Sequence, residues 1–387
     1  MTDLVVDVDK PAHGGSCVGR VDGRVVFVGY SLPGERVRAA LVDGDQKSRF
    51  WRADGLEVLG DPSPGRVPSP CPWFGPGLCG GCSWLHVDPA VQVELKADVL
   101  AETLARLGGI EQKIAVRSLG RETGWRTRVT LHVDDRGTAG FHRVRSRDVV
   151  GVADCRQADP RLDLPGLLGD SWPPGATIHT SVSDAGRAVL VRTGDDVVAT
   201  GPAEHSHLVL GREFRCAVDG FWQSHRDAAE VLVSQVVELS GAGTGDRILD
   251  LFAGVGLFGL LLLDRCSPAA VTIVEGNRTA AGFARRNGGQ DPRVDVLARD
   301  VRKWARRPRP ADVVVLDPPR AGAGREVVAG IAATRARTVI YVSCEPSTLA
   351  RDLKFFAATG YVPDHIEGFD VFPGTAHVET VVRLRRH

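Results

Sequence analysis

The architecture of this chain is set by one stretch, Arg247-Ile248-Leu249-Asp250-Leu251-Phe252-Ala253-Gly254-Val255-Gly256, in which an apolar run ends in a glycine-rich turn. Further apolar runs follow, separated by helix-like segments such as 279–287. These runs cover residues 271–275, 294–297, 313–317 and 339–343. Continuous apolar strands that alternate with helices are typical of a parallel sheet covered on both faces. We therefore expect a doubly wound α/β domain over residues 210–387.

Polar side chains follow several of these runs directly. In such folds, ligands bind at the carboxyl ends of the parallel strands, which all meet at one edge of the sheet. The polar residues at or near these ends are Asp250, Glu275, Asp300, Asp317 and Cys344. The sequence therefore predicts a single site that gathers them.

The glycine turn suggests a nucleotide-like ligand. Gly254 and Gly256 begin a G-x-G-x-x-G pattern, and Glu275 follows at about the 20-residue distance expected of a ribose-binding acid. Alone, this pattern suits a nicotinamide enzyme equally well. Asp250, directly before the turn, would repel a pyrophosphate but suits the cationic amino-acid part of S-adenosylmethionine. Asp300 is either a contact to the adenine or an exposed acid at a strand end.

One cysteine stands out by its position. Cys344 ends the apolar run Ile340-Tyr341-Val342-Ser343 and precedes Glu345-Pro346, downstream of Asp317-Pro318-Pro319-Arg320. A thiolate is a strong nucleophile near neutral pH, and a strand end holds it rigidly while leaving it accessible. The alternative interpretation is an ordinary buried thiol. The neighbouring motifs favour the nucleophile.

Composition limits the classes of protein to consider. The chain has 387 residues, which indicates two or three domains, and its 43% hydrophobic and 25% charged residues are typical of a globular protein. It contains neither a run of about 20 apolar residues nor a signal-peptide pattern, so we expect a cytoplasmic protein without a membrane partner. Because 48 basic residues balance 48 acidic ones, binding of a nucleic acid would require a local positive surface.

The segment 4–58 consists of short alternating runs separated by turns, which predict a small antiparallel barrel. Several cations lie along it, and they form either a solvated face or an RNA-binding surface. They are Arg20, Arg24, Arg36, Arg38, Lys47, Arg49 and Arg52.

A Pro/Gly-rich linker over 61–70 leads into three clustered cysteines, Cys71, Cys79 and Cys82, and Cys155 follows later. Disulfides are rare in the cytoplasm, so this clustering calls for another explanation. Four thiolates suit either an iron-sulfur cluster or a tetrahedral zinc ion. Unrelated cysteines are the least favoured interpretation, because Cys-Gly-Gly-Cys places two sulfurs on one tight loop.

A helix is expected between these cysteine segments. Asp88 is a capping acid, Pro89 suits the first turn, apolar residues follow at helical period, and Gly108-Gly109 ends the pattern.

Taken together, these residues resemble the class I RNA 5-methyluridine methyltransferase family (TrmA/RumA-like). The most specific motifs are 317–320, 343–346 and Thr375-Ala376-His377-Val378-Glu379. The resemblance implies three domains: a TRAM-like (OB-like) RNA-binding β-barrel over 1–59, a central α+β cluster-binding domain over 60–209, and a Rossmann-like S-adenosylmethionine-dependent methyltransferase domain over 210–387.

The resemblance also implies roles for individual residues. Cys344 resembles the nucleophile of the family and Glu379 its base. The positions that match cofactor-binding residues are Gln223, Phe252, Glu275 and Asp317. The positions that match ligands of a 4Fe-4S cluster, with zinc as the alternative, are Cys71, Cys79, Cys82 and Cys155.

The expected activity is methylation of carbon 5 of a uridine in RNA, with ribosomal RNA favoured over transfer RNA and no role for DNA. Carbon 5 of uracil is a weak nucleophile, so addition of Cys344 to carbon 6 would activate it. Phe221 or Trp222 would stack on the extruded base. Two alternatives stay open: an amino-methyltransferase acting on a purine or a protein amide, suggested by the 317–320 motif, and a non-catalytic RNA-binding iron-sulfur protein.

Overall fold

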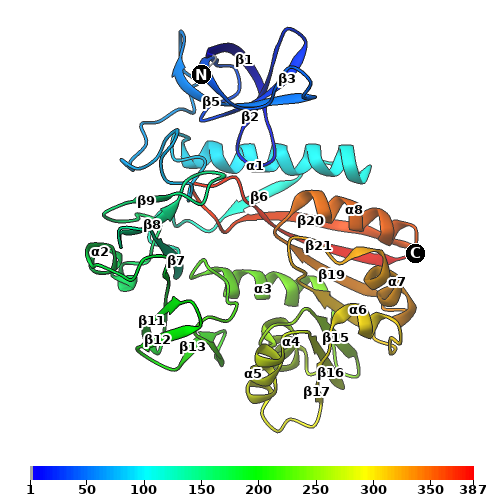
Figure 1. Ribbon diagram of the computed structural model, residues 1–387. Helices are drawn as coiled ribbons and strands as arrows, with labels where there is room; N and C mark the ends of the chain where they lie inside the picture. Colours follow the sequence, from blue (N-terminus) through cyan, green and yellow to red (C-terminus); the bar gives the residue numbers. More distant parts are fainter. Residues whose placement is uncertain (1–2) are drawn as a thin grey trace.

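The computed structural model describes residues 3–387, so the first two residues of the expected N-terminal domain lie outside it. A small barrel lies at one end of the molecule, and helix α1 separates it from a large sheet with helices on both sides (Figure 1). A second sheet lies beside these elements. Within residues 3–387, we find no helix with the length and apolar character needed to cross a membrane.

The barrel is closed, with the strand order β1-β2-β3-β5-β4. Its strands are β1 (Asp3–Pro11), β2 (Cys17–Val21), β3 (Arg24–Gly29), β4 (Arg36–Asp43) and β5 (Phe50–Val58). Alternate residues of β1, such as Val6 and Val8, point into its core, because successive side chains of a strand face opposite sides. The predicted barrel is confirmed, although β3 and β5 pair in parallel rather than antiparallel fashion.

Helix α1 (Pro89–Thr103) begins as the sequence predicts. The carboxylate of Asp88 accepts a hydrogen bond from the Ala90 amide at 2.9 Å, and Pro89 occupies the first turn. The helix continues as a single π turn, Leu104–Gly108, and ends at Gly109, whose φ of 72° is one that glycine adopts without strain.

The second sheet has six strands in the order β12-β11-β10-β7-β8-β9. Their bounds are β7 (Arg128–Val133), β8 (Ala139–His142), β9 (Val149–Gly151), β10 (Thr177–Ser183), β11 (Gly186–Thr193) and β12 (Asp196–Thr200). The short helix α2 (Leu164–Gly169) packs on this sheet, and the hairpin β13 (Glu204–Val209) and β14 (Arg212–Ala217) leads into the large sheet.

The large sheet has eight strands in the order β17-β16-β15-β18-β19-β21-β20-β6. Its strands are β6 (Ala115–Ser118), β15 (Arg247–Leu251), β16 (Ala270–Glu275), β17 (Val294–Ala298), β18 (Val313–Leu316), β19 (Thr338–Ser343), β20 (Tyr361–Asp370) and β21 (Glu379–Arg386). The run β17 to β19 is parallel, as predicted, whereas β21 lies antiparallel to both of its neighbours.

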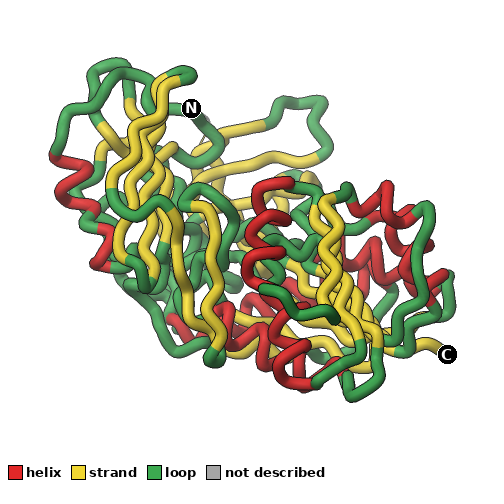
Figure 2. The backbone as a smooth tube through the Cα atoms, turned by 90° about the horizontal axis from the view of Figure 1, so that it is seen from below, coloured by secondary structure: helices red, strands yellow, loops and turns green. Residues whose placement is uncertain are grey.

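Helices cover both faces of this sheet (Figure 2), and each face has its own apolar core. One face packs against α3 (Ala228–Ser240), α4 (Leu257–Cys266) and α5 (Arg278–Gly288). The other packs against α1, α6 (Val301–Ala305), α7 (Gly324–Thr334) and α8 (Pro346–Ala357). Strand β6 and helix α1 thus join the large sheet, although both fall within the range 60–209 expected for the central domain.

Candidate active site

Asp250 lies beneath the glycine loop rather than in it. Its side chain is completely buried, and Oδ2 accepts a hydrogen bond from the Gly259 amide at 2.8 Å in the first turn of α4. Burial raises its pKa to about 8. Asp250 therefore ties the end of β15 to the helix through Oδ2, whereas its buried Oδ1 has no hydrogen-bond partner among the described residues.

The loop between β15 and α4 has an unusual backbone. Phe252 and Gly254 both have a φ of 57°, and Gly256 has a φ of 90° at the N-cap of α4. Oε2 of Glu275, at the end of β16, accepts a hydrogen bond from the Gly254 amide at 2.8 Å. Positive φ is costly for a phenylalanine, so contacts of this kind hold the loop in shape.

A small cavity of about 30 Å³ lies above this loop. It brings together Gln223, Phe252, Gly254 and Asp317, four of the residues that the resemblance or the glycine pattern assigns to the cofactor. Its rim also includes Phe221, whose side chain is 70% exposed. Trp222 also lines the cavity, but it is buried and stacks on His207 with ring centroids 4.3 Å apart, so it packs against the core as well.

Four of the expected cofactor residues do not line this cavity, and one of them, Glu275, is linked to it only by its hydrogen bond with the Gly254 amide. Asp250 lies below the loop, and Gly256 is buried at the start of α4. Asp300 is exposed and caps α6 by accepting a hydrogen bond from the Lys303 amide at 3.1 Å. Asp300 is thus an exposed acid just after β17, as one of the two interpretations of the sequence has it, and its contact with the adenine stays a prediction.

The thiol and two carboxylates meet where three strands of the large sheet end. Cys344 follows β19, in which Ser343 pairs with Thr380 of β21. Because these strands are antiparallel, the next residues in register are Cys344 and Glu379. Asp317 directly follows β18, the other neighbour of β19.

The electrostatics confirm that these groups interact. Burial, together with the nearby charges of Glu379 and Asp317 and opposed by the Arg320 guanidinium, raises the pKa of the Cys344 thiol to about 12. Burial also raises the pKa of Asp317 to about 7 and, together with the charge of Asp317, raises that of Glu379. The Cys344 thiol and two carboxyl groups with raised pKa values thus lie together in a poorly solvated space.

Two supporting interactions were not expected from the sequence. Lys96 of α1 is fully buried, forms an ion pair with Asp370 at the end of β20, and donates a hydrogen bond to the Phe372 carbonyl at 3.1 Å. This pair anchors the segment that leads to Glu379. A lysine within the apolar stripe of a helix is a signal that sequence analysis can detect.

The second interaction joins the barrel to the segment that carries the thiol. His13, in the loop between β1 and β2, lies 3.3 Å from the carboxylate of Glu345, the residue after Cys344. Nothing in the sequence around His13 indicates this long-range contact.

The four clustered cysteines surround one cavity of about 40 Å³. Cys71, Cys79 and Cys82 come from the loop before α1, and Cys155 comes from the loop after β9. Arg126 also lines this cavity, and its buried Nε has no hydrogen-bond partner among the described residues. Within residues 3–387, no three His, Cys, Asp or Glu side chains are arranged to hold a single metal ion.

Family models match three segments of the chain. Residues 309–387 match the model for tRNA (Uracil-5-)-methyltransferase, and residues 219–336 match the methyltransferase small domain. Residues 3–48, which form most of the barrel, match the TRAM domain.

Whole-length relatives extend this result. An uncharacterized RNA methyltransferase from Streptomyces coelicolor is 38% identical over 98% of this chain and 92% of its own length. The 23S rRNA (uracil(1939)-C(5))-methyltransferase RlmD from Alkalilimnicola ehrlichii is 32% identical over 97% of this chain and 95% of its own length.

Among solved structures, the tRNA (uracil-54, C5)-methyltransferase of Pyrococcus abyssi in complex with S-adenosyl-L-homocysteine has the same fold, with a TM-score of 0.73, 24% identity, and coverage of 98% of this chain and 100% of that one. Fold, strand-end constellation and whole-length similarity agree. The chain therefore belongs to the family of S-adenosylmethionine-dependent RNA (uracil-C5)-methyltransferases, and its residues 3–48 form a TRAM domain.

Proposed function

We propose that this RNA (uracil-C5)-methyltransferase acts by covalent catalysis, with Cys344 as the nucleophile and Glu379 as the general base. The observation that carries this proposal is the register of β19 and β21, which sets the two side chains beside each other. Both groups are partly or fully withdrawn from water, which strengthens their electrostatic interaction with a bound ring.

The ionised Asp317 carboxylate takes the proton of the Cys344 thiol, and the thiolate attacks carbon 6 of the uracil, so that a sulfur–carbon bond forms and the electrons of the 5,6 double bond move into an enolate. Bound S-adenosylmethionine supplies the electrophilic methyl group that carbon 5 then accepts. Glu379 removes the remaining proton from carbon 5, the double bond forms again, and Cys344 leaves as a thiolate.

Asp317 is placed to assist the thiol. Its raised pKa of about 7 keeps a substantial fraction of this carboxyl group neutral at physiological pH. A neutral carboxyl group donates a hydrogen bond to a developing oxyanion, which stabilises the enolate. Gln223 and the exposed ring of Phe221 line the adjacent cavity, where they orient the extruded base and stack on it.

The cofactor is held at the loop after β15. Phe252, Gly254, Gln223 and Asp317 line the cavity, and Glu275 fixes the Gly254 amide. Glu275 is also the acid that we expect at the ribose hydroxyls of the bound cofactor. Asp250 holds the first turn of α4 through Oδ2, and its Oδ1, unpartnered in the part of the chain that the structure describes, is the atom that we expect to contact the cofactor.

The test is methyl transfer to RNA by Cys344→Ala. We expect loss of transfer with retained binding of S-adenosylmethionine, because the thiol lies at the strand end and not in the cofactor loop. Cys266→Ala, at the end of α4, is the matched control and should keep full activity. Wild-type turnover by Cys344→Ala would rule out the covalent mechanism.

Ribosomal RNA is the substrate we favour over transfer RNA. The support is the relative named as a 23S ribosomal RNA enzyme, which is 32% identical over 97% of this chain, whereas the structure named for transfer RNA is 24% identical. Mapping of 5-methyluridine in both RNA classes from cells with and without the protein tests this choice. Loss of the modification from transfer RNA alone would reverse it.

We further propose that Cys71, Cys79, Cys82 and Cys155 hold a 4Fe-4S cluster. They surround a cavity instead of converging on one point, an arrangement that suits a cluster better than a zinc ion bound at about 2.3 Å by each sulfur. The Gly81 amide donates a hydrogen bond to the Cys79 sulfur at 3.4 Å, and the buried Nε of Arg126 lacks a partner, so both favour an anionic group. The cluster would link the loop before α1 to the loop after β9.

Anaerobic purification followed by assays of iron, acid-labile sulfide and zinc distinguishes the ligands. We expect iron and sulfide in the wild type and their loss from Cys82→Ala, while Cys266→Ala retains both. Stoichiometric zinc without sulfide would establish the alternative.

A further inference from the structure

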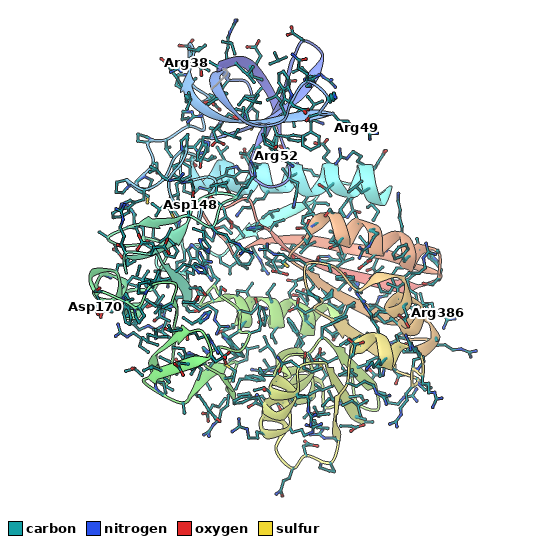
Figure 3. The ribbon with its side chains drawn as sticks, viewed as in Figure 1. Arg38, Arg49, Arg52, Asp148, Asp170 and Arg386 are labelled. Atoms are coloured by element: carbon teal, nitrogen blue, oxygen red, sulfur yellow. The ribbon has the colours of Figure 1, made fainter. Side chains whose placement is uncertain are left out.

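A groove that the active site does not use lies between the barrel and helix α1. It encloses about 540 Å³, within the range of about 300–1,000 Å³ typical of ligand sites. Its walls come from three separate parts of the chain: strands β1 to β3 and β5 of the barrel, α1 with its π turn, and the loop between β8 and β9. Figure 3 shows Arg52 in this position, between the barrel and α1.

The groove is strongly basic. Its cationic or titratable basic residues are Lys10, His13, Arg52, Arg106 and Arg145, whereas Glu102 is its one acidic residue in the described chain. Glu102 forms an ion pair with Lys10, and Asp43 forms one with Arg52. Arg106 and Arg145 are exposed, and no described side chain or carbonyl accepts a hydrogen bond from either of them. These two guanidinium groups are therefore free to bind an anion.

The outer face of the barrel is less suited to this role. Arg38 lies between the carboxylates of Asp3 and Glu57, and Arg24 donates to the carbonyls of Asp45 and Gln46. Several of the cations that the sequence suggested for RNA binding thus have partners within the barrel. Arg106 and Arg145 of the groove have no hydrogen-bond or ion-pair partner among the described residues, so they are available to a ligand from outside.

The groove leads to the active site. His13 lies at its inner end and contacts Glu345, the residue after the nucleophile. Phe27 adds an aromatic ring to the wall, next to Phe50 at a centroid distance of 5.5 Å. A basic groove with an aromatic ring is typical of sites that bind single-stranded nucleic acid.

We propose that the groove between the barrel and α1 binds the phosphodiester backbone of the RNA strand that flanks the target uridine, with Arg106 and Arg145 each contacting a phosphate. This proposal rests on the proposed function, since it assumes an RNA substrate at Cys344. It assigns the path of the strand to residues of α1 and of the β8–β9 loop in addition to the barrel.

The test compares Arg106→Gln/Arg145→Gln with the control Arg309→Gln/Arg386→Gln, whose arginines lie outside the groove lining. Binding of a short single-stranded RNA of mixed sequence is measured over a range of salt concentrations. Loss of two phosphate contacts should reduce the slope of log affinity against log salt by about 1.4, at about 0.7 per contact. The KM for RNA should rise while kcat is retained, and the control should match the wild type.

The two proposals fail in distinguishable ways. An unchanged salt slope and KM in the groove variant, while wild type and variant both methylate RNA, would overturn the groove alone. Failure of the wild type itself to transfer methyl groups to uracil in total RNA would overturn the proposed function.

Discussion

At the scale of single residues, the site contains two carboxyl groups whose pKa values are raised by burial. Glu379 is 4% exposed and next to Asp317, and both have raised pKa values. A carboxylate of this kind is a stronger base than an exposed one once it has lost its proton. The same burial that makes Glu379 costly to ionise thus makes it effective at carbon 5.

Glu379→Gln should trap the reaction after methyl transfer, because a glutamine cannot accept the proton from carbon 5. The expected product is a covalent protein–RNA adduct that carries the new methyl group and persists on a denaturing gel. Glu326→Gln, which changes an exposed glutamate of α7, should form no such adduct. If Glu379→Gln turns over normally, another group is the base.

Asp250→Asn should change the pH dependence of stability. The folded-state pKa of Asp250 is raised from 3.8 to about 8, so the folded protein binds one more proton than the unfolded chain between these values. The free energy of unfolding therefore falls as pH rises through this window. In Asp250→Asn this fall should be less steep by about 1.4 kcal/mol per pH unit, as measured by urea unfolding from pH 5 to 7. Identical slopes in both proteins would contradict the assignment.

The sequence predicted the positions of residues at strand ends better than the contacts that these residues make. Cys344 and the parallel strands were predictable because an apolar run and its end are local patterns. The position of Asp250 beneath the loop was not, since it depends on a hydrogen bond to Gly259, in the next helix. The contact of His13 with Glu345 spans most of the chain and leaves no local pattern at all.

At the scale of secondary-structure elements, β20 and β21 were missed. β20 contains Pro363, Asp364, Glu367 and Gly368, which interrupt the apolar pattern that marks the other strands. Helix α1 was predicted with its cap, but its buried Lys96 shows that it also supports the segment between these two strands.

Lys96→Met should destabilise the protein by about 3–5 kcal/mol, because it leaves the carboxylate of Asp370 buried without a partner. Denaturant unfolding measures this cost. Arg38→Met is the matched control: it breaks exposed ion pairs of the barrel, and its effect should be much smaller than that of Lys96→Met. Equal effects of the two substitutions would show that the buried pair does not stabilise the fold.

At the scale of the whole molecule, the barrel and the methyltransferase sheet meet at the catalytic loop. The charge of Glu345 raises the pKa of His13, and the hydrogen bond to His13 lowers that of Glu345 to about 2. The charged form of this contact is present at low pH and is lost as pH rises through the raised pKa of His13. Arg320 and His377 also lie within electrostatic range of this pair.

His13→Ala should lower kcat while leaving the KM for S-adenosylmethionine unchanged, because it releases Glu345 without touching the cofactor loop. His13→Gln, which keeps a hydrogen-bond donor, should retain part of the activity. His365→Ala serves as the control, since it removes a comparable histidine–glutamate contact on β20, outside the site. A normal kcat in His13→Ala would show that the contact is incidental.

The place of β21 between β19 and β20 has a consequence for synthesis on the ribosome. β19 and β20 leave the exit tunnel before β21, which must be inserted between them. Until then, the edges of β19 and β20 that face the gap have no strand to pair with. Because β21 begins with Glu379, the residue that we propose as the base takes its place only when the last gap of the sheet is filled. Under the proposed mechanism, an earlier intermediate lacks the base that completes the reaction and releases the methylated RNA.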